Sequence, residues 1–110
     1  MNHLPNKQWG ATLWPFIHTI TVLDFDNPEF QRRMTESVIE NLRGISAIIP
    51  CKSCAADYDV FFKTQIDKRD QFGRLELFYL FVDFHNTINQ KIRKPIVSHA
   101  DALLLWTKMV

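Results

Sequence analysis

Two cysteines, Cys51 and Cys54, are the residues of this 110-residue chain best suited to chemistry. Their i, i+3 spacing in "IPCKSCAADY" places both sulfurs on one face of a helical turn, and Pro50 favours a helix that begins at Cys51. The free amide groups and the dipole of a helix N-terminus favour a thiolate, and C-x-x-C cysteines commonly titrate below the free value of about 8.5. The pair therefore predicts a dithiol/disulfide exchange site with one attacking and one resolving sulfur.

Spacing alone leaves other interpretations of the cysteine pair open. The two thiols could form half of a zinc site that His18, His85 or His99 completes, or they could be ordinary buried thiols. A thioredoxin-like fold is disfavoured because its βαβ pattern is missing, and a secreted disulfide scaffold would contain more cysteines. Redox chemistry is the favoured hypothesis, and a zinc-stabilised helical interaction module is the alternative.

A second candidate group lies in "DFHNTINQKIRKP", after the strongly apolar segment "LELFYLFVDF". Helical spacing puts His85 and Asn89 on one face of an otherwise buried helix. Buried polar groups need hydrogen-bond partners, so either the protein satisfies them or a ligand lies against them. Lys91 and Lys94 follow, and they suit either a ligand with a heterocycle and phosphates or a solvated basic helix end.

Helical periodicity predicts the elements that position these residues, whereas strand signals are weak. Pro15 is tolerated in the first helix if Thr12 is its N-cap or if the helix kinks there. Asn27 is a candidate N-cap with Pro28 at the first helical position. The fold class expected is all-α, a four-helix bundle plus a short fifth helix. The five segments cover approximately residues 9–23, 26–49, 51–66, 74–92 and 98–109.

The composition sets limits on domain organisation and on partners. With 46% hydrophobic residues and only three glycines, the chain is expected to form one domain over residues 1–110. A formal net charge of +1 without a basic run argues against nucleic-acid binding. No apolar run reaches the ~20 residues of a membrane span, and the first ten residues do not resemble a signal peptide.

The motifs in combination resemble those of the Erv/ALR family of FAD-dependent sulfhydryl oxidases. In that family C-x-x-C is followed by H-N-x-x-N-x-x-(hydrophobic)-x-K-P, which is similar to "CKSC" and "HNTINQKIRKP" here. The segment "WGATLWPFIH" resembles the family's W-G-x-x-x-W-x-x-x-H, and Trp106 stands where the family has a late tryptophan. The resemblance runs from Trp9 to Trp106, and the small size is similar to that of members carried by large DNA viruses.

The resemblance implies a helical bundle that holds FAD at its mouth, usually as a homodimer. It implies that Cys51 and Cys54 are catalytic, with Cys51 facing the substrate and Cys54 the flavin, and that electrons pass to O2 to give H2O2. The expected substrate is a thiol-containing protein or a redox relay protein. The cofactor-binding residues implied are Gly10, Trp14, His18, Cys54, His85, Asn86, Asn89, Lys91, Lys94 and Trp106.

The chain departs from many family members in two respects. It has neither a second, shuttling cysteine pair nor a structural disulfide near His99, so substrate dithiols are expected to reach Cys51 directly. A homodimer is expected through the first two helices, with Phe25, Phe30 and Met34 as candidate contacts. The expected location is the cytoplasm, that of the host cell if the chain is viral, with association with virions as a further expectation.

Overall fold

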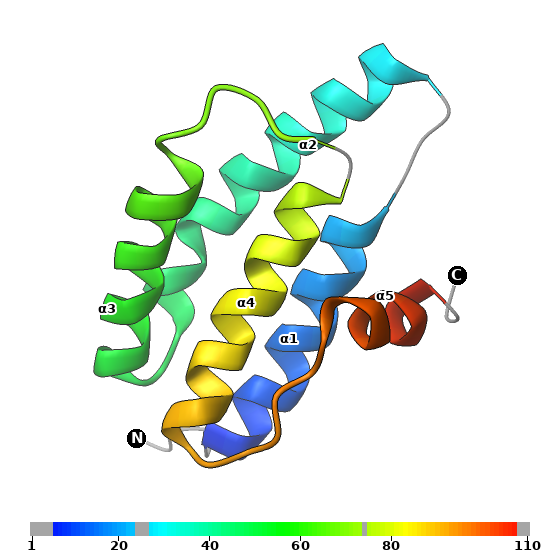
Figure 1. The fold of residues 1–110 in the computed structure, drawn as a ribbon. Coiled ribbons are helices and arrows are strands. Elements are labelled where there is room, and N and C mark those ends of the chain that lie inside the picture. The colour runs from blue at the N-terminus through cyan, green and yellow to red at the C-terminus, as the bar shows by residue number, and fades with distance from the viewer. Residues whose placement is uncertain (1–5, 24–26, 74, 108–110) are drawn as a thin grey trace.

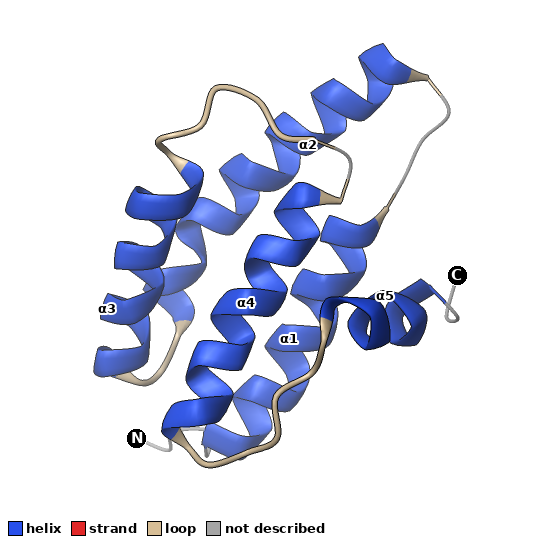
Figure 2. Cartoon of the chain, viewed as in Figure 1, coloured by secondary structure: helices blue, strands red, loops and turns tan. Residues whose placement is uncertain are grey.

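The computed structural model describes residues 6–23, 27–73 and 75–107, with the backbone alone for residues 6–9. All regular elements in these ranges are helices, which confirms the all-α expectation for this part of the chain (Figure 2). They are α1 (Asn6–Val22), α2 (Pro28–Arg43), the 3-10 helix η1 (Gly44–Ile48), α3 (Lys52–Phe61), the π-helix η2 (Phe62–Ile66), α4 (Glu76–Lys91) and α5 (His99–Thr107).

The apolar helix α4 lies at the centre of the arrangement. It packs along α1, which also contacts α2, while the short α5 lies across α1 and α4 (Figure 1). The start of α3 and the end of α4 lie at the same end of the molecule. That end therefore brings the C-x-x-C segment next to the segment that carries His85 and Asn89.

Aromatic side chains from α3 and α4 form much of the core. Phe81 is fully buried and meets Phe61 edge-on, with ring centroids 5.0 Å apart. Tyr58 is 2% exposed, and its hydroxyl donates a 2.6 Å hydrogen bond to the carbonyl of Leu42. Burial raises the pKa of Tyr58 well above its usual value, so the phenol stays neutral and able to donate. This contact holds α3 against the end of α2.

Of the two ways in which Pro15 could be tolerated in α1, the structure excludes Thr12 as the N-cap. The helix already includes Asn6, so Thr12 is not its N-cap and Pro15 lies inside it. An interior proline lacks the amide that would bond the carbonyl of Ala11, and it costs ~3 kcal/mol. Seven residues after Pro15 remain in the helix, because its buried face packs on α4 and outweighs that local cost.

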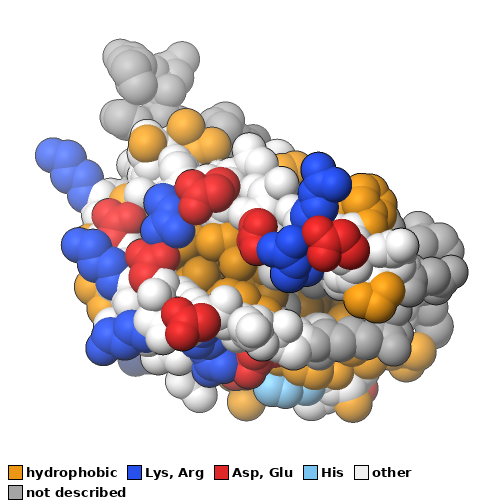
Figure 3. All heavy atoms as spheres, turned by 90° about the horizontal axis from the view of Figure 1, so that it is seen from above, with side chains coloured by type: hydrophobic (Ala, Val, Ile, Leu, Met, Phe, Trp, Pro, Cys, Tyr) orange, Lys and Arg blue, Asp and Glu red, His pale blue; other side chains and the backbone are white. Residues whose placement is uncertain are grey.

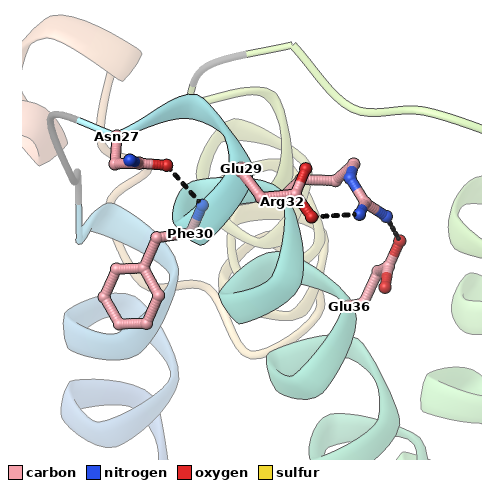
Figure 4. A network of polar contacts seen from close by, with 5 residues as sticks. All are labelled: Asn27, Glu29, Phe30, Arg32 and Glu36. Carbon is pink, nitrogen blue, oxygen red and sulfur yellow. Dashed lines mark hydrogen bonds and ion pairs between the residues drawn. The ribbon is translucent and has the colours of Figure 1, made fainter.

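The predicted start of α2 is confirmed. The Asn27 side chain accepts a 3.0 Å hydrogen bond from the Phe30 amide (Figure 4). Pro28 follows the cap as the first residue of the helix. On the exposed face, Arg32 bridges Glu29 and Glu36 at 2.8 Å each. Such exposed pairs contribute little to stability, because water screens them. The helix end is therefore defined mainly by its cap.

A cavity of about 740 Å³ lies between α2 and the segment that joins η2 to α4. Figure 3 views the molecule from above and shows charged side chains around a hollow with an apolar floor. The lining includes Arg32, Arg43 and Arg69, and each of them is already paired with a carboxylate. None of the candidate residues from the sequence lines it.

No helix in the described ranges combines the length and the apolarity that a bilayer crossing requires.

Candidate functional site

Cys51 is the N-cap of α3, which confirms the predicted helix start. Its backbone is extended (φ −106°, ψ 117°), and its Sγ accepts a 3.3 Å hydrogen bond from the amide of Cys54. The Ser53 hydroxyl lies 3.3 Å from the same sulfur. A thiolate at this position gains hydrogen bonds and the favourable end of the helix dipole.

The surroundings of the two cysteines shift their pKa values in opposite directions. The pKa of Cys51 is lowered, chiefly because the Cys54 thiol can donate a hydrogen bond to it and secondarily because Ser53 can. Burial raises the pKa of Cys54 to about 11, and the neighbouring Cys51 sulfur adds to that shift. When one proton is lost from the reduced pair, the negative charge therefore resides on Cys51.

A cavity of about 420 Å³ opens beside the second cysteine, between α1, α4 and α5. Its volume lies within the usual range of ligand pockets, about 300–1,000 Å³. Seven residues predicted from the sequence meet in its wall, although they come from four different parts of the chain. The lining residues are Gly10, Ala11, Trp14, Pro15, Cys54, His85, Ile88, Asn89, Ile92, Lys94 and Trp106.

A stack of aromatic rings forms the inner wall of this cavity. The rings of Trp14 and His85 are nearly parallel, with centroids 3.9 Å apart. His18 lies behind them, 2.9 Å from His85 through Nε2 and Nδ1, and its ring is 5.3 Å from that of Trp106. His18 does not line the cavity but supports two of its walls, and its buried Nδ1 has no hydrogen-bond partner among the described residues.

Burial keeps both histidines neutral. It lowers the pKa of His18 to about 4, with the charge of His85 as a second cause. Burial also lowers the pKa of His85 to about 4, with Lys94 as the second cause. In a neutral pair, one of the two nitrogens, His18 Nε2 or His85 Nδ1, carries a hydrogen and donates it to the other. Two imidazolium rings at this distance would repel each other.

These pKa shifts predict that acid destabilises the fold. Because the folded pKa lies below the unfolded value of about 6.5, the unfolded state binds more protons as the pH falls from 6.5 to 4. His18 alone should lower the free energy of unfolding by on the order of 2 kcal/mol between pH 7 and pH 5. Urea unfolding at the two pH values measures this loss. His18→Asn should reduce the difference, and equal losses in wild type and His18→Asn would contradict the assignment.

A turn at the end of α4 brings Lys94 to the cavity. The Lys94 amide donates to the carbonyl of Asn89 at 2.8 Å and the Arg93 amide to that of Gln90 at 3.2 Å, while Arg93 adopts a left-handed φ of 59°. This is the hydrogen-bond pattern of a Schellman cap, in which glycine usually occupies the left-handed position. The strained Arg93 backbone therefore turns the chain so that Lys94 lies near Asn89.

Two residues of the predicted cofactor set lie elsewhere. Lys91 forms a 2.8 Å ion pair with Asp57 and lines a separate groove between α3 and α4. The side chain of Asn86 is hydrogen-bonded to the backbone of Val97. By contrast, Asn89 is 7% exposed, and its side-chain amide has no hydrogen-bond partner among the described residues, so it is available to a ligand.

Sequence reasoning missed four cavity residues that carry no polar group. Ala11 and Pro15 directly follow Gly10 and Trp14 on α1, and Ile88 and Ile92 flank Asn89. Helical spacing from Trp14 and Asn89 was the available signal for them.

The geometry does not support the zinc alternative. No group of three or more metal-binding side chains is found in the described ranges. Of the proposed histidine ligands, His18 and His85 are paired with each other, and His99 is 2.5 Å from Asp83.

Comparisons with known proteins identify relatives over most of the chain. The model of the Erv1/Alr family matches residues 11–108. A protein of Invertebrate iridescent virus 3, whose name describes an FAD-linked sulfhydryl oxidase, is 30% identical over 91 residues, covering 81% of this chain and 59% of that protein. The mitochondrial FAD-linked sulfhydryl oxidase ERV1 of Saccharomyces cerevisiae is 27% identical over 92 residues, covering 81% and 45%.

An FAD-linked sulfhydryl oxidase of Oryza sativa is 26% identical over 106 residues, covering 96% of this chain and 53% of that protein. The chain thus spans about half the length of these relatives. No solved structure matches the chain to a significant degree.

Proposed function

Because the chain belongs to the Erv1/Alr family, we propose that it is an FAD-linked sulfhydryl oxidase that forms disulfides in dithiol substrates. One observation carries this proposal: Cys54, one sulfur of the C-x-x-C pair, lies in the wall of a cavity built from the residues that resemble the family's flavin motifs. The second sulfur, Cys51, lies outside the cavity lining, where a substrate can approach it.

The cavity residues fit FAD. The parallel Trp14 and His85 rings and the Trp106 ring offer surfaces on which a flat heterocycle can stack. The Asn89 side-chain amide, which has no hydrogen-bond partner among the described residues, can bond a polar ring edge, and the Lys94 ammonium suits a diphosphate. When bound, FAD supplies a two-electron acceptor that returns electrons to oxygen, giving hydrogen peroxide.

The chemistry of the chain's own residues is thiol–disulfide exchange. A substrate thiolate attacks Sγ of Cys51 in the Cys51–Cys54 disulfide, and Cys54 leaves as a thiolate with the bonding electron pair. The second substrate thiolate attacks the substrate sulfur of the mixed disulfide, and Cys51 leaves with its electron pair. The low pKa of Cys51 makes it the better leaving group in this second step. The reduced pair then holds the two electrons, with Cys54 beside the cofactor site.

We propose a thiol-containing protein or a redox relay protein as the substrate, O2 as the acceptor, and a homodimer as the assembly. Phe30 is 47% exposed and Met34 is half-buried, so both can contribute to an interface on α2. Phe25, the third predicted contact, lies outside the described residues. A monomer mass by light scattering at micromolar concentration would exclude the dimer.

The function predicts a yellow protein. Purified material should absorb near about 450 nm, as bound flavin does, and should consume oxygen when dithiothreitol is added. Heat-released FAD quantified against protein should approach one equivalent. A colourless protein that contains stoichiometric zinc would instead support the interaction module, and a yellow protein without oxygen consumption would contradict the oxidase.

A further inference from the structure

The Asn86 side chain bonds the connection between α4 and α5 at both of its polar atoms. Its Nδ2 donates to the carbonyl of Val97 at 2.7 Å, and its Oδ1 accepts from the Val97 amide at 2.9 Å. A side-chain amide that satisfies both backbone groups of one residue fixes that residue's position and orientation. Val97 comes two residues before α5 begins.

A second contact fixes the first residue of α5 to α4. The ring of His99 stacks on that of Tyr79, with centroids 4.5 Å apart and planes 13° apart. Its Nε2 lies 2.5 Å from a carboxylate oxygen of Asp83. Asp83, Asn86 and Tyr79 all belong to α4, so the start of α5 is held by side chains of one helix.

The rest of α5 packs through Ala102, Leu103 and Trp106, which lie against a small apolar cluster that includes Val22, Phe78 and Val82. Ala102 is its buried residue, while Leu104 and Leu105 are more than half exposed. This helix carries Trp106, whose ring contacts that of His18 and closes one side of the cavity. The placement of Trp106 therefore depends both on this packing and on the contacts that hold the start of α5.

We infer that Asn86 is a positioning residue for the cofactor. Its two hydrogen bonds to Val97, called the clamp below, fix the start of α5 so that this helix holds Trp106 over the cavity. This inference rests on the proposed function for the identity of the cofactor. It differs from direct contact between Asn86 and FAD, the role that the motif implied. The Asn86 side chain does not line the cavity, and both of its polar atoms are occupied by Val97.

The first test is hydrogen exchange of the purified protein, with Asn86→Ala compared with wild type. Two hydrogen bonds of typical strength are lost, so the amides of α5 should exchange about 10- to 30-fold faster. Amides in the middle of α4 should keep their protection. Asn41→Ala is the matched control, because Asn41 also bonds a backbone carbonyl, that of Ser37 at 2.8 Å, but lies on α2. Unchanged exchange of α5 in Asn86→Ala would overturn the clamp whether or not FAD binds.

The second test is the rate at which FAD leaves the loaded protein in Asn86→Ala, Trp106→Ala and the double variant. The single Asn86→Ala change should speed release by about 10- to 30-fold, whereas adding it to Trp106→Ala should change the rate by less than about 3-fold. Additive effects would mean that Asn86 acts independently of Trp106 and would overturn the inference. A wild-type protein that binds no FAD would refute the proposed function, while the exchange test would still decide the clamp.

Discussion

Replacing either Cys51 or Cys54 with serine is expected to lower dithiol oxidation by on the order of 10³-fold or more. Exchange needs one sulfur that is attacked and one that leaves, and a hydroxyl can do neither at neutral pH. Both variants should keep the fold, since neither sulfur belongs to the buried core. Both should retain FAD, because the other walls of the cavity are unchanged. Oxygen consumption with dithiothreitol as substrate measures the loss.

The same two variants should differ in the reactivity of the remaining thiol. In Cys54→Ser, Cys51 is accessible at a helix N-terminus and should be alkylated readily by iodoacetamide at pH 8. In Cys51→Ser, burial still raises the pKa of Cys54, so alkylation should be slower and should accelerate only at higher pH. Ser53→Ala, at an exposed position between the two cysteines, is the matched control and should retain most of the activity, because both sulfurs remain. The reverse order of reactivity would exchange the roles of the two sulfurs, and normal activity in both variants would exclude the C-x-x-C mechanism.

The sequence predicted the helices best where local signals and packing agree. Asn27 and Pro28 define the start of α2 through their own side chains, and the structure confirms this cap. Pro15 made Thr12 a candidate N-cap of α1, and that alternative failed because burial of the helix face against α4 outweighs the local cost of the proline. That burial depends on a contact between segments more than fifty residues apart, which no local pattern contains.

Helix geometry explains which motif residues reach the cavity. At about 100° per residue, Asn89 lies within about 40° of His85 around α4, whereas Asn86 and Lys91 lie about 100° or more to either side. The motif groups these residues by sequence, but the helix points Asn86 toward Val97 and Lys91 toward Asp57. Lys94 reaches the cavity only because Arg93 adopts a left-handed conformation that reverses the chain. Glycine usually occupies such a position, so the arginine in the sequence did not predict this turn.

Gly10→Leu is expected to weaken FAD binding by about 10- to 100-fold while the protein remains folded. Gly10 lies within α1 and lines the cavity, so a leucine side chain there would occupy space that the cofactor needs. Overfilling a packed site typically costs about 1–3 kcal/mol, which corresponds to this range of dissociation constants. The dissociation constant can be measured by adding FAD to the flavin-free protein. Gly44→Leu is the matched control, because Gly44 lies at the end of α2, outside that cavity, where a Cβ would meet no atom within 4 Å.

Gly10→Ala should have opposite effects on the stability of the fold and on the affinity for FAD. Gly10 has no positive φ, and a Cβ would meet only Trp14, at an ordinary distance of 3.7 Å. Neither the backbone nor the packing of the chain therefore requires glycine, which costs a helix interior about 0.5–1 kcal/mol relative to alanine. Alanine should raise the free energy of unfolding of the flavin-free protein by about that amount and yet reduce its affinity for FAD. Opposite signs in urea unfolding and FAD titration would show that glycine serves the ligand at the expense of the fold. If Gly10→Ala and Gly10→Leu both bound FAD with wild-type affinity, this cavity would not be the flavin site.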